Sequence, residues 1–196
     1  MRKYFRIMVG IFVGLLISSC AIFKKRIDPE IAYTTDSGFR FKFAMPGEWY
    51  PGPGAQGQYV VGQNAADSGS SKLALVKHGP VFTNNGAAAS NSEILASFKK
   101  NIEAESKGGR VNKVSNEFTQ KKFKGADCLF FQQTGEDAGA AAPMTIRNDG
   151  LVCLNPKRKY NYIWMAISER NPVTQPPSQT LTKDKQSLFE SLEFVD

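Results

Sequence analysis

The sequence contains few of the side chains that metal sites and disulfide-rich domains use. It has one histidine and three cysteines, which excludes a cysteine-rich zinc domain and a small domain held together by many disulfides. Long apolar runs of about 20 residues are missing too, which excludes a protein with several membrane spans. Glycine and proline, at 17 and 10 of 196 residues, are too scarce for collagen. The composition, 41% hydrophobic and 22% charged, is that of one ordinary globular domain.

The N-terminal segment carries the most specific signal in the chain. Arg2, Lys3 and Arg6 precede an unbroken run of apolar residues and glycine from Ile7 to Ile17. A run of this length is typical of the hydrophobic region of an export signal, and it is shorter than a spanning helix. The small residues at 18–20 end the run as a cleavage site would.

The tetrapeptide Ile17-Ser18-Ser19-Cys20 resembles the lipobox of bacterial lipoproteins. The resemblance implies that the Cys20 thiol takes a diacylglycerol, that the preceding bond is cut and that the new amine is acylated. Two or more acyl chains then anchor the protein in a membrane, at about 0.8 kcal/mol per buried CH₂. In this family an Asp after the cysteine favours the inner membrane, and Ala21 stands here, so we expect the outer membrane, facing the periplasm. The alternatives are an uncleaved anchor and a plain export signal.

These features divide the chain into a signal peptide (1–19), a lipidated tether (20–37) and an α+β domain (38–196). Basic residues at 24–26 lie beside the anchor, where each adds about 1 kcal/mol of attraction to an anionic leaflet; a solvated linker is the alternative. Removing residues 1–19 leaves 22 basic and 18 acidic side chains, a balance of +4 instead of the formal +7. Much of the basic character therefore belongs to the signal.

Hydrophobic periodicity predicts the elements of the mature domain. Phe39, Phe41 and Phe43 alternate with charged residues and predict a strand. Further strands are expected over 58–62, 72–77, 110–119, 125–134, 144–154 and 159–169, the last four as a meander.

Two helices are expected beside these strands. Ser90 and Glu93 have the spacing of a capping box, and apolar residues at one-face spacing predict a helix over 92–107. A second helix follows the proline-rich segment 171–179. Its apolar face contains Leu181, Leu188, Phe189 and Leu192. The fold class is therefore α+β, an antiparallel sheet with two packed helices.

The order of these elements resembles the PsbP/Mog1-like domain over nearly all of the mature chain. The pattern consists of Phe39-x-Phe41-x-Phe43-x-Met45-Pro46-x-x-Trp49, a central helix, a meander and Phe189-x-Ser191-Leu192. Members of this superfamily include photosystem extrinsic subunits, nuclear-transport regulators and bacterial envelope lipoproteins. The resemblance implies a binding or assembly module rather than an enzyme. It carries over no catalytic residues and no cofactor.

A search for catalytic residues gives little. His78 is the only imidazole, it lies near no Gly-x-Ser-x-Gly motif, and we expect it exposed in a turn at a strand end. Tyr160, Tyr162 and Trp164 alternate along a predicted strand, where a core or partner surface is favoured over base stacking. We therefore predict no enzyme, no metal, no cofactor and no nucleic-acid partner.

Cys128 and Cys153 are 25 residues apart and would meet an oxidising compartment after export. If the strands that contain them pair with Gly135 opposite Ile146, the two cysteines lie directly across from each other and a disulfide is possible. A register shift of two residues would leave two buried thiols instead. Both outcomes stay open at this point.

Two basic groups flank the same predicted hairpin. They are Lys121, Lys122 and Lys124 before its first strand, and Lys157, Arg158 and Lys159 after its second. Antiparallel pairing brings both groups to one end of the sheet. This basic cluster predicts docking to an anionic surface, such as lipid head groups or an acidic envelope protein; basic turns that serve only solubility are the alternative.

We therefore expect a membrane-anchored envelope lipoprotein that acts as a non-catalytic binding or accessory module. One alternative is a carrier of a small apolar ligand, which needs an apolar cavity between helix and sheet. Another is an envelope hydrolase, which needs His78 within hydrogen-bond reach of a nucleophile.

Overall fold

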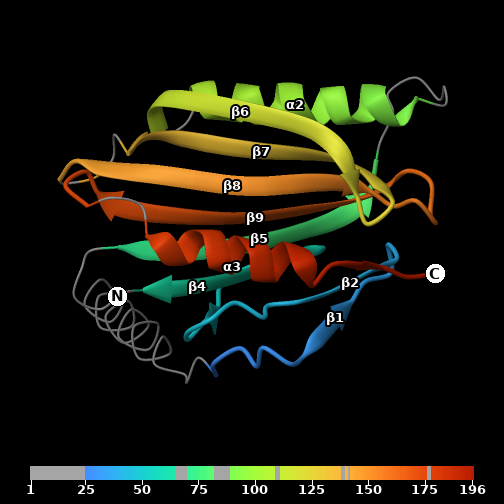
Figure 1. Cartoon of the computed structure of the whole chain (residues 1–196), viewed down its shortest axis with the longest axis horizontal. Helices are drawn as coiled ribbons and strands as arrows, with labels where there is room; N and C mark the ends of the chain where they lie inside the picture. The colour runs from blue at the N-terminus through green and yellow to red at the C-terminus, as the bar shows by residue number, and fades with distance from the viewer. Residues whose placement is uncertain are drawn as a thin grey trace, which may run out of the picture.

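The computed structural model describes residues 25–64, 70–81, 89–108, 111–137, 140, 142–175 and 178–196. Within these residues, antiparallel strands form two sheets, and two helices pack on the larger sheet (Figure 1). The elements are β1 (Ala32–Thr34), β2 (Phe39–Lys42), β3 (Tyr50–Pro51), β4 (Gln58–Asn64), β5 (Ser71–Pro80), α2 (Asn91–Gly108), β6 (Val111–Phe123), β7 (Ala126–Asp137), β8 (Met144–Leu154), β9 (Asn161–Pro172), α3 (Gln179–Glu190) and β10 (Glu193–Phe194). The predicted α+β class is confirmed.

The larger sheet has seven strands in the order β3-β4-β5-β9-β8-β7-β6. Its β6–β9 part is the predicted meander, with β6 and β9 each longer at their C-terminal ends than expected. The pairing of β5 with β9, in which Leu75 lies opposite Ala166, joins the meander to the early strands. This pairing links residues far apart in the sequence, which hydrophobic periodicity does not reveal.

The strand predicted at Phe39–Phe43 is present as β2 but lies in a separate sheet of order β1-β2-β10. The expected single sheet is therefore wrong on this point. The boundary between tether and domain at residue 38 is also wrong, because Tyr33 of β1 pairs with Phe41 and stacks on its ring at 5.5 Å. Ile27 already donates a backbone hydrogen bond to Trp49. A strand of three residues is too short for its alternation to be recognised in the sequence.

Both predicted helices are present, with α2 close to its predicted bounds. The capping box is confirmed: the Ser90 N–H donates to Glu93 Oε2 at 2.8 Å, and the Glu93 N–H donates to Ser90 Oγ at 3.3 Å. Ser178 caps α3 by accepting from the Thr180 N–H. No helix among the described residues is long and apolar enough to cross a bilayer.

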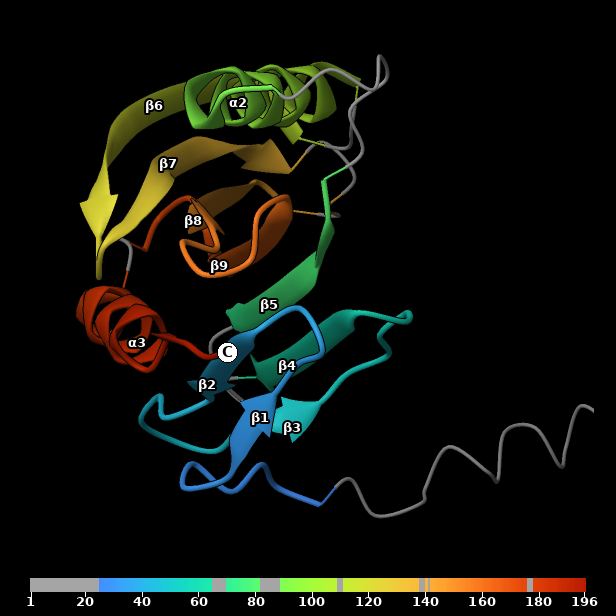
Figure 2. The same cartoon turned by 90° about the vertical axis from the view of Figure 1, so that its right-hand side faces the viewer.

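The helices cover opposite faces of the seven-stranded sheet (Figure 2). Leu151 and Cys153 of β8 belong to the core under α3, whereas Val152 and Leu154 belong to the core under α2. This alternation follows from the two-residue period of a strand. The small sheet adds its phenylalanines to the core under α3.

Candidate functional site

Of the two registers that the sequence left open for the β7–β8 hairpin, the structure has the one with Gly135 opposite Ile146 and Cys128 opposite Cys153. The two cysteines form a disulfide in the structure, with the sulfurs 2.02 Å apart. Both residues are fully buried in the core under α3. The disulfide therefore closes a hairpin inside the core. The lipidation residue Cys20 lies outside the described residues.

The six residues of the basic cluster lie at one end of the sheet, as predicted, because the β6–β7 and β8–β9 turns are at the same end (Figure 1). Acidic groups, however, lie among them. Lys122 pairs with Asp127 at 2.8 Å, and Lys157 pairs with Asp196 at 3.2 Å. The positive charge of this end is therefore partly balanced locally.

Two further cations of the cluster bind main-chain oxygens of the same molecule. Lys124 donates to the carbonyls of Glu190 and Leu192 beyond the end of α3, and Arg158 donates to the carbonyl of Asp36. Lys121 lies over the ring of Phe130 at 4.4 Å. These contacts give the basic cluster a structural role in addition to its charge.

His78 does not lie in an exposed turn, because β5 continues through it to Pro80; its side chain is only 10% exposed. Its Nδ1 lies 3.0 Å from Ser37 Oγ. The Asp36 carboxylate approaches the same Nδ1 at 3.8 Å. Burial lowers the pKa of the His78 imidazole, and Asp36 partly opposes this effect.

The Ser37–His78 pair lacks the arrangement of a catalytic triad. In a triad the serine and the acid contact different ring nitrogens, so that the acid orients the base. Here both contact Nδ1, and Ser37 is itself buried. The pair therefore joins the turn before β2 to β5. Sequence reasoning missed Ser37 because 41 residues separate it from His78.

Tyr160, Tyr162 and Trp164 do not form one exposed row. Tyr160 lies in the turn before β9 with a φ of 62°. Tyr162 and Trp164 pack against Phe98 of α2, with ring centroids 4.8 and 6.4 Å away. Two of the three aromatics thus belong to the core under α2.

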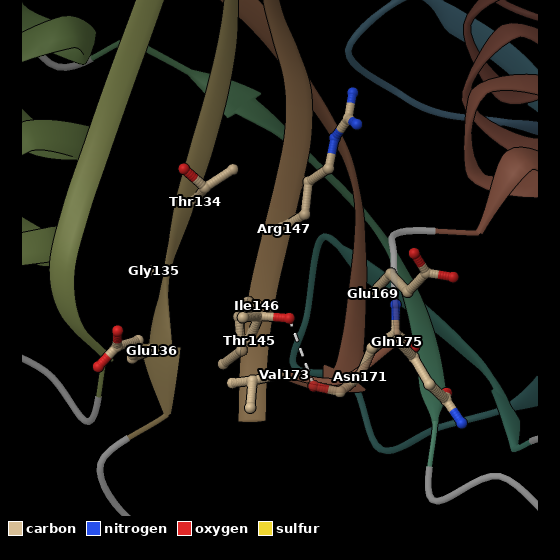
Figure 3. Close-up of a pocket in the computed structure, with 10 residues that line it drawn as sticks. All are labelled: Thr134, Gly135, Glu136, Thr145, Ile146, Arg147, Glu169, Asn171, Val173 and Gln175. Carbon is tan, nitrogen blue, oxygen red and sulfur yellow. Dashed lines mark hydrogen bonds between the residues drawn. The ribbon is translucent and has the colours of Figure 1, made fainter. Parts of the chain in front are cut away.

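A pocket of about 410 Å³ lies at the sheet end opposite the basic cluster. Figure 3 shows that its residues come from β7, β8, β9 and the segment that leads toward α3. They are Thr134, Gly135, Glu136, Thr145, Ile146, Arg147, Glu169, Asn171, Val173 and Gln175. Seven of these ten residues have polar or charged side chains, although carbon atoms form more of the exposed pocket wall than polar atoms do. Two of the three charged side chains are carboxylates.

A network of ion pairs around the buried Asp149 joins this pocket to α3. Asp149 accepts from Arg147 through both carboxylate oxygens, at 3.1 and 3.0 Å. Lys185 of α3 donates to the same carboxylate at 2.8 Å. The hydrogen bond to Asp149 raises the pKa of Arg147, against the effect of burial. Arg147 therefore stays charged at the edge of the pocket.

Two further contacts attach α3 to this part of the sheet. Lys72 of β5 pairs with the buried Asp184 at 2.6 Å and also donates to Thr180. Glu169 accepts at 2.9 Å from the N–H of Ser178, the N-cap residue of the helix. Two residues of the pocket lining are thus connected to α3, Glu169 directly and Arg147 through Asp149.

None of the pocket residues is among the sites predicted from the sequence. The sequence does contain one indication of this charged region. Leu151 and Cys153 point to the same face of β8, and counting back in steps of two along the strand gives Asp149, Arg147 and Thr145. Extending the face in this way places charged residues where a core is expected. Buried charges of this kind need partners and often mark functional positions.

Among the described residues, no group of three or more His, Cys, Asp or Glu side chains is arranged to hold a metal ion. No protein-family model matches the chain, and no curated protein matches it. The functional argument therefore rests on the residues themselves.

Proposed function

We propose that the chain is a bacterial envelope lipoprotein, anchored through Cys20, whose domain of PsbP/Mog1-like architecture acts as a non-catalytic binding or accessory module. The lipobox Ile17–Cys20 supports the anchor. The first described residue that contacts the domain is Arg26, whose guanidinium lies 3.5 Å from Glu48 Oε1. Six residues span at most about 22 Å when extended, so the anchor would keep the domain close to the bilayer.

The observation that carries this proposal is the pairing of Cys128 with Cys153. Disulfides persist in oxidising compartments such as the periplasm and are rare in the cytosol. The pair lies in the β7–β8 hairpin, more than 100 residues away from the N-terminal signal. It therefore supports export by a line of argument independent of the lipobox.

The two alternative functions receive less support. A hydrolase would use His78, and its only close hydroxyl, that of Ser37, shares Nδ1 with Asp36 among the described residues. A carrier of an apolar ligand would need an apolar cavity, whereas Ile146 and Val173 are the only large apolar residues that line the described pocket. A polar binding module agrees better with these surfaces.

The anchor is tested by expressing the full chain and its Cys20→Ala variant in a Gram-negative host and separating membranes from soluble protein. We expect wild type in the membrane fraction with the mass of an acylated cysteine, and the variant in the soluble periplasmic fraction. A Cys128→Ala/Cys153→Ala variant is the matched control and should stay on membranes. Equal membrane binding of wild type and Cys20→Ala, without an acyl mass, would refute the proposal.

A further inference from the structure

The seven-stranded sheet ends in two edge strands of very different length. At one edge, β3 has two residues, Tyr50 and Pro51, and proline has no N–H to donate. At the other edge, β6 has 13 residues and contains no proline. Within the residues that the structure describes, β7 is the only strand that pairs with β6. Proteins usually shorten or block an exposed edge, so β6 is the place in this fold where a further strand can pair.

The β6–β7 turn determines which backbone groups of β6 face outward. Lys124 and Gly125 form a two-residue turn with φ of 49° and 83°. In a hairpin of this kind the flanking residues, Phe123 and Ala126, exchange both of their backbone hydrogen bonds. Such pairs alternate along the strands, so the odd-numbered residues of β6 over 115–123 donate to and accept from β7.

The position of the disulfide agrees with this alternation. Cys128 lies opposite Lys121 of β6 and therefore directs its backbone groups toward that strand. On its other side, its Cα lies 4.2 Å from that of Cys153, the short separation of a pair that does not exchange hydrogen bonds. The N–H and C=O groups of the even-numbered residues Phe118 and Gln120 consequently point away from β7.

Pairing of β6 with a second copy of itself, about a two-fold axis at Thr119, matches both hydrogen bonds and charges. In this antiparallel register, Phe118 lies opposite Gln120 of the second copy, and the two exchange backbone hydrogen bonds. Glu117 lies opposite Lys121 of the second copy, and Lys121 opposite its Glu117. The charged pairs occupy the positions without hydrogen bonds, where opposite side chains are closest.

Glu117 and Lys121 are available for these pairs. Both are exposed, and neither forms an ion pair with another described residue; Lys121 lies over the ring of Phe130, and Glu117 acts electrostatically on Arg147. A lysine on an edge strand normally discourages pairing, but opposite a glutamate it favours one register. An axis at Glu117 or at Lys121 would instead place like charges opposite each other, which is destabilising.

We propose that two copies of this chain associate through β6, so that their seven-stranded sheets continue into one another across the two-fold axis. The inference goes beyond the proposed binding function and does not depend on the lipid anchor. The register shift between Asn112 and Ser115 ends the regular part of β6 and limits the pairing to its C-terminal part. A contact of this length belongs to the small, reversible interfaces.

Thr119→Cys tests the position of the axis. We expect mild oxidation of the full chain in non-ionic detergent to link two copies through this residue. Opposite residues at such a position have Cα atoms about 4.5 Å apart, which a disulfide can bridge. Thr182→Cys, at an exposed position of α3, is the matched control and should stay unlinked.

Reversal of the charges tests the register. Glu117→Lys and Lys121→Glu each place like charges opposite each other at both pairs, so we expect the dissociation constant of the dimer to rise about tenfold or more. The combined variant, Glu117→Lys/Lys121→Glu, restores opposite charges and should dimerise within about threefold of wild type. Lys100→Glu, on the exposed face of α2, is the control and should change the constant less than about twofold.

These constants are measured by sedimentation equilibrium of the full chain in density-matched detergent. Unchanged thermal unfolding of each variant would show that loss of the dimer is not loss of the fold. The proposal is overturned if wild type is a monomer at submillimolar concentration, if the combined variant dimerises as weakly as the single ones, or if Thr182→Cys links as fully as Thr119→Cys. None of these outcomes bears on the fractionation of Cys20→Ala, so failure of the pairing is distinct from failure of the anchor.

Discussion

The two ends of the sheet face under α3 differ in the kind of side chain that contacts the helix. At one end Cys128, Leu151 and Ile163 form a dry apolar core against Leu188. At the other end, Glu169 accepts from the N-cap residue of the same helix, and Asp149 pairs with Arg147 and with Lys185 of the helix. One helix therefore rests on an apolar core at its C-terminal end and on ion pairs at its N-terminal end.

This difference separates two ways in which the sheet face holds α3. Apolar burial is non-directional and leaves no donor or acceptor unused. A buried ion network is strong only when every member is satisfied. Asp149 and Asp184 meet this condition through their pairs with Arg147, Lys185 and Lys72.

The largest expected effect is loss of the disulfide at the apolar end. The bridge joins residues 25 positions apart, for which chain entropy gives about 3.5 kcal/mol of stabilisation. Cys128→Ala/Cys153→Ala should lower the free energy of unfolding by about this amount in urea titration, and Cys20→Ala should not. Thiol titration of the unfolded, non-reduced chain is the direct check, since two free thiols besides Cys20 would contradict the bridge.

The charged end should respond less strongly and in a different way. Asp149→Asn removes the carboxylate to which both Arg147 and Lys185 donate, and we expect a loss of about 2–3 kcal/mol. The loss stays below that of a fully buried ion pair because both cations are about one quarter exposed. Lys122→Ala, in an exposed pair with Asp127, is the control and should cost less than about 1 kcal/mol.

Replacing all three ions of this network together sharpens the comparison. A variant with Arg147→Met, Asp149→Leu and Lys185→Leu fills similar volumes without charge, and should unfold close to wild type or at higher urea. If it is instead less stable than Asp149→Asn, the ion pairs contribute stability that apolar packing cannot replace.

The apolar end could be predicted from the sequence and the charged end could not. The two strands of the hairpin were predicted, and the register that pairs Cys128 with Cys153 was one of the two outcomes that the sequence left open. Arg147 and Asp149 continue that alternation, but their side chains are typical of solvent-exposed positions, so the sequence alone indicates a surface. Only the pairing of β9 with β5 and the position of α3 bury them.

The short strands and the contacts of the small sheet could not be predicted from the sequence for a related reason. Its β1 and β10 strands have three and two residues, too few for any alternation to stand out. The contact between Ser37 and His78 depends on this sheet docking against β5. Contacts that depend on docking between separate elements are decided by the three-dimensional packing and not by local pattern.

His78 gives a pH-dependent test of the contact between the small sheet and β5. Burial lowers its pKa below the ordinary value of 6.5, so the unfolded chain binds a proton more readily than the folded one. The stability that it contributes is complete above about pH 6.5 and is lost as the pH falls. Between about pH 7.5 and 5, the free energy of unfolding of wild type should fall relative to that of His78→Gln.

The neighbouring acid supplies the control for that measurement. Asp36 raises the pKa of His78 against the effect of burial, so Asp36→Asn should lower it further and steepen the loss of stability in acid. Parallel pH profiles for wild type and His78→Gln would show that the imidazole does not contribute to this dependence.

The smallest effect is expected from the basic cluster at the apolar end of the sheet. Its charges face solvent, where attraction is screened beyond about 8 Å at physiological salt. Asp127 and Asp196 also offset two of its lysines. Binding of a Cys20→Ala chain to anionic vesicles should therefore be weak and detectable only at low salt, and Lys121→Glu/Lys122→Glu/Lys157→Glu should abolish it.

Arg158 is left unchanged in that variant because it holds the Asp36 carbonyl, so its loss would disturb the turn before β2. The matched control, Lys99→Glu/Lys100→Glu/Lys183→Glu, changes the net charge equally but acts on α2 and α3. If both variants lose vesicle binding to the same extent, net charge and not the cluster is responsible. If the Cys20→Ala chain without these lysine substitutions fails to bind vesicles even at low salt, the basic cluster contributes only to solubility and to the internal contacts of Lys124 and Arg158.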